Sequence, residues 1–121
     1  MRIISPSLLS ADFTDIRNQL SHLQSLGIDR LHLDVMDGHF VPNLTFGPFI
    51  IKQLRAITNL HLETHLMIKK PEKYLQEYID AGSDTLIFHY EATNMTRESL
   101  NKIKSKGIKC GLSIKPETPH E

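Results

Sequence analysis

The sequence is short of several residue types, and each shortage excludes a class of protein. It contains no tryptophan and a single cysteine, Cys110. One cysteine cannot form an internal disulfide, which excludes a disulfide-stapled scaffold. Cys110 stands in an apolar stretch without an activating pattern around it. We therefore expect a reduced core residue in a cytosolic protein rather than a nucleophile.

An excess of charge of one sign and long apolar runs are absent as well. Lys and Arg number 14 and Asp and Glu number 14, so the formal net charge is +0 at pH 7. This balance disfavours nucleic acid as a partner. The apolar runs are far shorter than a membrane span, and residues 1–6 lack the apolar region of a signal peptide. We expect a cytoplasmic protein without a membrane partner.

Strand and helix patterns alternate along the chain. Strand patterns cover residues 3–9, 30–36, 60–68, 85–90 and 108–115. Between them, apolar residues recur at helical spacing after four start signals, at Asp12, Pro48, Pro71 and Thr96. Alternating βα units predict one parallel sheet with right-handed crossovers, which is an α/β fold. No Pro/Gly/Ser-rich linker interrupts the pattern.

The stretch 32–43 is the most informative part of the sequence. Side chains two apart on a strand share a face, so His32, Asp34 and Met36 point the same way. His65 falls on the corresponding face of the next strand pattern. Two imidazoles and a carboxylate on adjacent parallel strands suit zinc or a similar first-row metal. On spacing alone, a structural His–Asp hydrogen bond is the commoner outcome.

The same residues carry a family resemblance. The run from His32 to Asn43, continued by Leu44-Thr45-Phe46-Gly47-Pro48, closely resembles the signature of the ribulose-phosphate 3-epimerase family. Four further segments resemble the first, third, fourth and fifth strands of that family in the same order: residues 4–13, 65–68, 88–92 and 111–116. The resemblance therefore extends over essentially the whole chain.

The resemblance implies an isomerase that interconverts ribulose 5-phosphate and xylulose 5-phosphate in pentose phosphate metabolism. It implies His32, Asp34 and His65 as ligands of one divalent metal ion, with zinc first and iron, manganese or cobalt as alternatives. Asp34 would also be the catalytic acid/base that moves the C3 proton through a 2,3-enediolate. A bound cation would stabilise the charge of that enediolate.

The resemblance also implies contacts with the sugar phosphate at four positions, namely Ser7, Met36, His65 and Met67. From the residues alone, Ser7 could equally be an interior hydroxyl bonded to backbone, and both methionines could be core. His89 and Glu91 share a strand face, where they either shape the pocket or bond each other, and we favour the structural role.

Three residues depart from the family pattern. Glu63 and Thr64 stand where the family usually has Asp and Val, and Lys115 replaces a common asparagine. We expect none of the three to touch the proposed ligands.

The family fold is a TIM-type (β/α) barrel of about 250 residues. The 121 residues here would supply the first four βα units plus strand five. We therefore expect residues 1–121 to be the N-terminal half of a single barrel domain, with Thr118 to Glu121 starting the next helix. The second catalytic aspartate and the phosphate-binding residues would lie outside the chain. A complete five-stranded open α/β sheet is the alternative.

A half barrel would leave strands one and five as open edges. We expect such a chain to be unstable, to dimerise through these edges or to need its missing half, and we favour a homo-oligomer. Other functions remain open at this point. A related ketose or hexulose-phosphate epimerase, such as an allulose-phosphate 3-epimerase, would carry the same metal-binding strand. Decarboxylases and synthases of phosphate-binding barrels often carry a lysine where Met36 stands, which argues against them. A non-catalytic half-barrel module that self-associates without metal is the last alternative.

Overall fold

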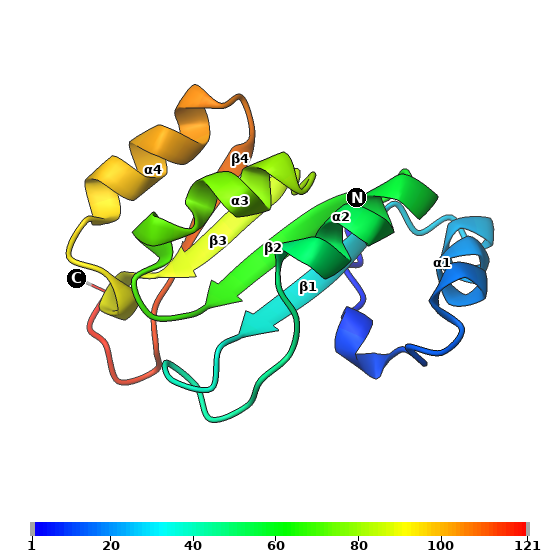
Figure 1. Ribbon diagram of the computed structural model, residues 1–121, viewed down its shortest axis with the longest axis horizontal. Coiled ribbons are helices and arrows are strands. Elements are labelled where there is room, and N and C mark those ends of the chain that lie inside the picture. Colours follow the sequence, from blue (N-terminus) through cyan, green and yellow to red (C-terminus); the bar gives the residue numbers. More distant parts are fainter. Residues whose placement is uncertain (1, 121) are drawn as a thin grey trace.

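One parallel sheet of four strands forms the centre of the structure. The computed structural model describes residues 2–120. The strands lie side by side in chain order: β1 (Arg30–Met36), β2 (His61–Met67), β3 (Thr85–His89) and β4 (Lys109–Ser113). Figure 1 shows the sheet as a twisted ribbon of arrows that all point the same way. The predicted parallel α/β fold is confirmed, and it is consistent with part of a TIM-type barrel.

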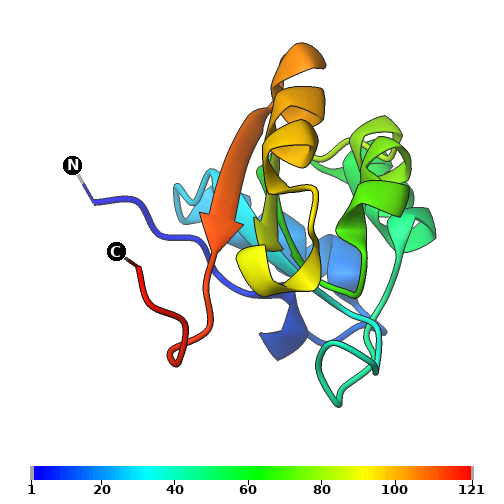
Figure 2. The ribbon, with the colours of Figure 1, turned by 90° about the vertical axis from the view of Figure 1, so that its left-hand side faces the viewer.

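Helices connect the strands and cover one face of the sheet. The α-helices are α1 (Ile16–Ser25), α2 (Pro48–Ile57), α3 (Leu75–Asp80) and α4 (Thr96–Ser105). Three short 3-10 helices accompany them: η1 (Leu8–Ser10), η2 (Pro71–Lys73) and η3 (Tyr90–Ala92). Figure 2 shows α2, α3 and α4 on one side of the sheet, whereas both terminal segments extend on the other side.

The core lies between the sheet and these helices. In β1 and β2 every second residue is buried, as expected for a strand with one covered face. The buried side chains include Leu33, Leu66 and Phe88 from the strands and Ile51 and Leu75 from the helices. The alternate side chains, among them those of the signature segment, therefore point to the face that the helices leave uncovered.

The predicted first strand differs most from the structure. Across residues 3–9 only Ser7 forms a β-bridge, to His32, beside a hydrogen bond from His32 N to Pro6 O of 2.8 Å. Pro6 has no N–H to donate to a ladder, and the chain turns into η1 directly after Ser7. The segment follows the edge of β1, but the prediction of a strand there was wrong.

Three predicted helix starts also differ. Asp12 caps a turn instead of α1, because Thr14 N and Thr14 Oγ1 both donate to Asp12 Oδ1, at 2.9 and 2.6 Å. Pro71 opens η2, and α3 follows it. At the other end, the chain forms no helix between residues 116 and 120. The last member of that predicted start, Glu121, lies outside the described residues.

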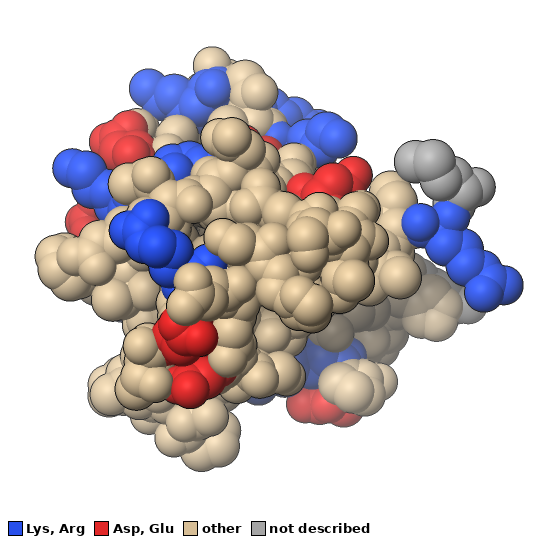
Figure 3. Space-filling view, turned by 90° about the vertical axis from the view of Figure 1, so that its right-hand side faces the viewer, with Lys and Arg blue, Asp and Glu red and all other residues tan. Residues whose placement is uncertain are grey.

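The helices, the single cysteine and the surface charges can be compared with the expectations from composition. Among residues 2–120, no helix combines the length and the apolar character needed to span a membrane. Cys110 packs against the core as predicted, but it is half-buried rather than buried. On the face drawn in Figure 3, charges of both signs are scattered around a largely uncharged centre.

Candidate metal centre

The pairing of β1 with β2 determines which side chains meet on the uncovered face. The register sets Asp34 opposite His65, and His32 opposite Glu63. Directly opposed side chains on one face have Cβ atoms close enough to interact. All four of these residues are half-buried. The strands thus bring two imidazoles and two carboxylates together.

His32, Asp34 and His65 converge on one point. Asp34 Oδ1 lies 3.0 Å from His32 Nε2 and 3.2 Å from His65 Nδ1. The three side chains each offer a donor atom, and these atoms all lie within 4.8 Å of one another. Their exposed fractions are 23%, 17% and 18%, so the cluster is reachable yet largely shielded. Two imidazoles and one carboxylate fit a first-row divalent cation.

The outer nitrogen of His32 meets a carboxylate. His32 Nδ1 lies 2.8 Å from Glu63 Oε1, and Arg30 Nη1 donates to Glu63 Oε2 at 2.9 Å. The expectation that Glu63 touches no ligand was therefore wrong, because the register sets the longer side chain directly across from His32. Burial alone would raise the pKa of Glu63, but hydrogen bonds from His32 and Arg30 outweigh it and lower that pKa.

The outer nitrogen of His65 meets another imidazole. His65 Nε2 and His89 Nε2 are 2.9 Å apart, and the two rings stack with centroids 5.0 Å apart. His89 Nδ1 is buried and lies 3.4 Å from Glu91 Oε2, which is long for a hydrogen bond. Burial lowers the pKa of both His65 and His89, which favours their neutral forms. Strand parity placed His89 on this face, but nothing in the sequence indicated its contact with His65.

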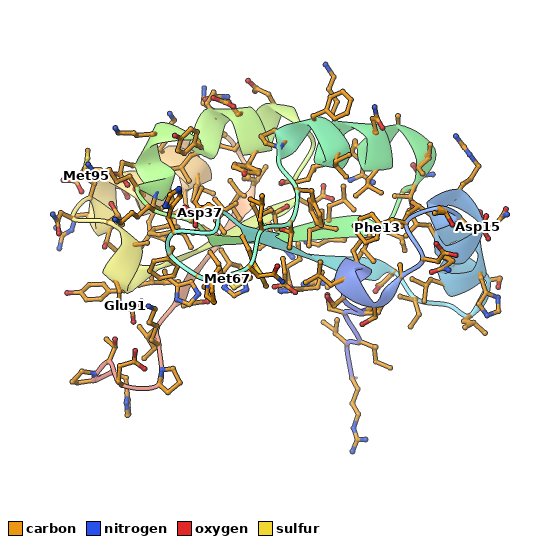
Figure 4. The ribbon with its side chains drawn as sticks, turned by 60° about the horizontal axis from the view of Figure 1, so that its bottom comes forward. Phe13, Asp15, Asp37, Met67, Glu91 and Met95 are labelled. Carbon is orange, nitrogen blue, oxygen red and sulfur yellow. The ribbon has the colours of Figure 1, made fainter. Side chains whose placement is uncertain are left out.

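Ser7 and the two methionines surround the same cluster. Ser7 Oγ donates to Asp34 Oδ2 at 3.2 Å and accepts from Leu9 N at 3.3 Å, so its partner is a carboxylate as well as backbone. Met36 and Met67 oppose each other at the carboxyl ends of β1 and β2, and both are half-buried. In Figure 4, Met67 lies on the side of the sheet away from α2 and α3.

The loop after β1 closes this end of the sheet. Asp37 Oδ1 accepts from His39 N and Phe40 N at 2.9 and 2.8 Å, and Asp37 Oδ2 accepts from Lys69 N at 2.8 Å. Asp37 therefore holds the loop through its side chain, whereas His39 contributes its backbone N–H. The loop sets the Phe40 ring 5.1 Å from the His89 ring, under Lys115 Nζ at 4.4 Å.

Comparison with known proteins adds a family to this geometry. The model of the "Ribulose-phosphate 3 epimerase family" matches residues 3–121. A ribulose-phosphate 3-epimerase of Bacillus subtilis is 43% identical over 116 residues, which are 96% of this chain and 54% of that protein. One of Treponema pallidum is 44% identical over 96% of this chain and 53% of its own length. A chloroplastic ribulose-5-phosphate-3-epimerase of Arabidopsis thaliana is 44% identical over 97% of this chain and 42% of its own length. The chain thus spans about half the length of these curated relatives.

Proposed function

The chain belongs to the ribulose-phosphate 3-epimerase family, and from this membership we propose that it forms part of a metal-dependent epimerase. The reaction would interconvert ribulose 5-phosphate and xylulose 5-phosphate. The observation that carries the proposal is the approach of His32 Nε2 and His65 Nδ1 to Asp34 Oδ1, at 3.0 and 3.2 Å. We further propose that residues 1–121 correspond to the N-terminal half of one barrel domain.

His32, Asp34 and His65 would hold one divalent ion, with zinc as the first candidate. Neutral imidazole nitrogens and a carboxylate oxygen are donors that zinc and its first-row neighbours accept. When bound, the ion supplies Lewis-acid stabilisation of the negative charge that develops on the oxygens of the substrate.

Asp34 would exchange the proton at C3 of the sugar phosphate. That proton is acidic because it lies next to the C2 carbonyl, and its removal leaves a 2,3-enediolate. Ser7 donates to Asp34 Oδ2, which holds the carboxylate in place for this transfer. Met36 and Met67 would present apolar surface beside the reacting carbons and keep water away from them, and His65 and Ser7 would also contact the substrate.

Inversion at C3 needs a second acid/base group on the opposite side of the substrate plane. Among the described residues, the other carboxylate beside the cluster is Glu63, which is engaged by His32 and Arg30. We propose that the second group and the phosphate-binding residues belong to the half of the domain outside this chain. The isolated chain would then invert C3 roughly 10²–10⁴-fold more slowly than a complete enzyme.

Zinc binding to the purified 121-residue chain tests the proposed site. We expect about one zinc ion per chain by equilibrium dialysis, lost in Asp34→Asn and His65→Ala because each removes a donor. His22→Ala is the matched control, because His22 is exposed on α1. Equal zinc binding by His65→Ala and His22→Ala would exclude His65 as a ligand.

The reaction itself is tested with the same preparation. Formation of xylulose 5-phosphate by the zinc-loaded chain is followed in a coupled assay, next to a full-length bacterial relative. We expect at least a ~100-fold lower rate for the chain. A rate equal to that of the relative would refute the assignment of the second acid/base group to the absent half.

A further inference from the structure

We propose that Glu63 is a positioning residue for His32, holding the proton on Nδ1 so that Nε2 presents its lone pair to the cation. This inference rests on the proposed metal site and adds a residue that belongs to no ligand set. Metal-bound histidines commonly donate their second ring N–H to a carboxylate, which sets the tautomer and the ring orientation and makes the ligand more basic.

The contact between the two side chains is direct. His32 Nδ1 and Glu63 Oε1 are 2.8 Å apart, while the opposite ring nitrogen of His32 faces Asp34 Oδ1 at 3.0 Å. An ionised carboxylate only accepts hydrogen bonds. With a cation held between His32 Nε2 and Asp34 Oδ1, the ring proton of His32 must therefore lie on Nδ1, where Glu63 accepts it. A neutral His32 ring with its proton on Nδ1 has its lone pair on Nε2, which points into the ligand cluster.

Two further side chains, Arg30 and Ser5, hold the Glu63 carboxylate in place. Arg30 Nη1 donates to Glu63 Oε2 at 2.9 Å, and Ser5 Oγ donates to Glu63 Oε1 at 3.4 Å. Arg30 lies on the same strand face as His32, two residues earlier on β1. The ion pair is partly buried, with the two side chains 21% and 18% exposed. Arg30 therefore holds the carboxylate in the position from which it meets His32.

The outer nitrogen of His65 has an imidazole as its partner, whereas that of His32 has a carboxylate. His65 Nε2 faces the ring of His89, whose other nitrogen stands 3.4 Å from Glu91. The ring of His89 therefore separates the Glu91 carboxylate from the ligand His65. His32 is the ligand with a direct anionic partner, so loss of Glu63 should weaken metal binding more than loss of Glu91.

The experiment compares zinc affinity, measured by competition with a chromophoric chelator, among variants of the 121-residue chain. We expect Glu63→Leu to weaken zinc binding roughly 10- to 100-fold. Glu63→Asp should recover part of this loss, because it retains the carboxylate. Glu98→Leu is the matched control, since it removes the same charge from an exposed position of α4. Should Glu63→Leu fail to fold, Glu63→Gln keeps the size of the side chain, and a smaller loss is expected.

A second readout reports on the contact without metal. In zinc-free protein with ¹⁵N-labelled histidine rings, the His32 Nδ1–H proton should give a downfield resonance that is protected from exchange with water. It should disappear in Glu63→Leu and persist in Glu98→Leu. A role of Glu63 that does not act through its contact with His32 would leave this resonance unchanged.

The two readouts separate the two proposals. If the wild-type chain binds no zinc, the proposed metal site fails, and the His32 resonance still decides whether Glu63 holds the ring. If the wild-type chain binds zinc and a folded Glu63→Leu or Glu63→Gln binds it within twofold of wild type, the positioning role is overturned. An Nδ1 proton unaffected by Glu63→Leu overturns it as well.

Discussion

At the scale of single residues, Glu91 joins segments that are distant in the chain. Lys115 N donates to Glu91 Oε1 at 2.6 Å and Thr118 Oγ1 donates to the same oxygen, which ties the tail after β4 to η3. Figure 4 shows Glu91 close to this tail. Desolvation opposes ionisation, but these hydrogen bonds outweigh it and lower the pKa of Glu91 from an ordinary 4.5 to about 2.

This lowered pKa predicts a pH dependence of stability. Because the folded pKa lies below the unfolded value, ionised Glu91 contributes its full stabilisation above pH 4.5, and the contribution is lost as pH falls toward 2. We expect Glu91→Gln to be less stable than wild type at pH 6, with the difference shrinking at pH 3. Urea unfolding at both pH values measures this, with exposed Glu98→Gln as control. A difference that grows on acidification would contradict the sign.

At the scale of secondary structure elements, Arg55 connects α2 to the starts of β2 and β3. Its Nη2 donates to the carbonyls of Thr58 and Leu60 at 2.7 and 2.8 Å, and its Nη1 donates to Asp84 Oδ2 at 2.8 Å. Asp84 Oδ2 also accepts from Leu62 N at 2.8 Å. One guanidinium therefore satisfies backbone groups at the end of the sheet opposite the metal cluster.

We expect Arg55→Lys to destabilise the chain by roughly 1–3 kcal/mol, because a single ammonium cannot reach all of these acceptors. The free energy of unfolding in urea is the measurement. Arg97→Lys, at an exposed position of α4, is the matched control and should change stability by less than about 0.5 kcal/mol. Equal stability of the two variants would show that the Arg55 contacts contribute nothing.

At the scale of the whole molecule, both borders of the sheet expose apolar side chains. Ile3 and Ile4, in the segment before the Ser7–His32 bridge, are 62% and 63% exposed. Leu112 in β4 and Ile114 directly after it are 43% and 42% exposed. A long sheet border with exposed apolar residues favours pairing with another chain. The molecule therefore combines a sheet face that helices cover with two sheet edges that expose apolar side chains.

We expect the chain to self-associate with increasing concentration, as measured by sedimentation velocity. Replacing both Leu112 and Ile114 with lysine should shift the distribution toward monomer, because the charges repel at the new contact. A pair of lysines at the exposed positions Gln24 and Ser25 of α1 is the control for added charge. Monomers at every concentration would refute association through the sheet borders.

The sequence by itself determined the order of the elements and the sidedness of the candidate site. Strands alternate with period two, so His32 and Asp34 share a face of β1. In β2 the alternate residues Leu62 and Leu66 are apolar and buried, which turns His65 to the uncovered face. Proline and glycine marked most turns, such as Pro48 at the start of α2 and Gly107 with φ of 77° after α4. Strand alternation and turn positions depend on residues close together in the chain, so a local sequence pattern can specify them.

Only the tertiary structure decided which ring nitrogen meets which partner. The contacts from Glu63 to His32 and from His89 to His65 depend on the register between strands, which the packing of the helices against the whole sheet determines. The same holds for residues 3–9, where the pattern favoured a strand but the chain makes a single bridge. Strand pairing is a non-local property, since its hydrogen bonds join residues far apart in the chain, and no local pattern specifies them.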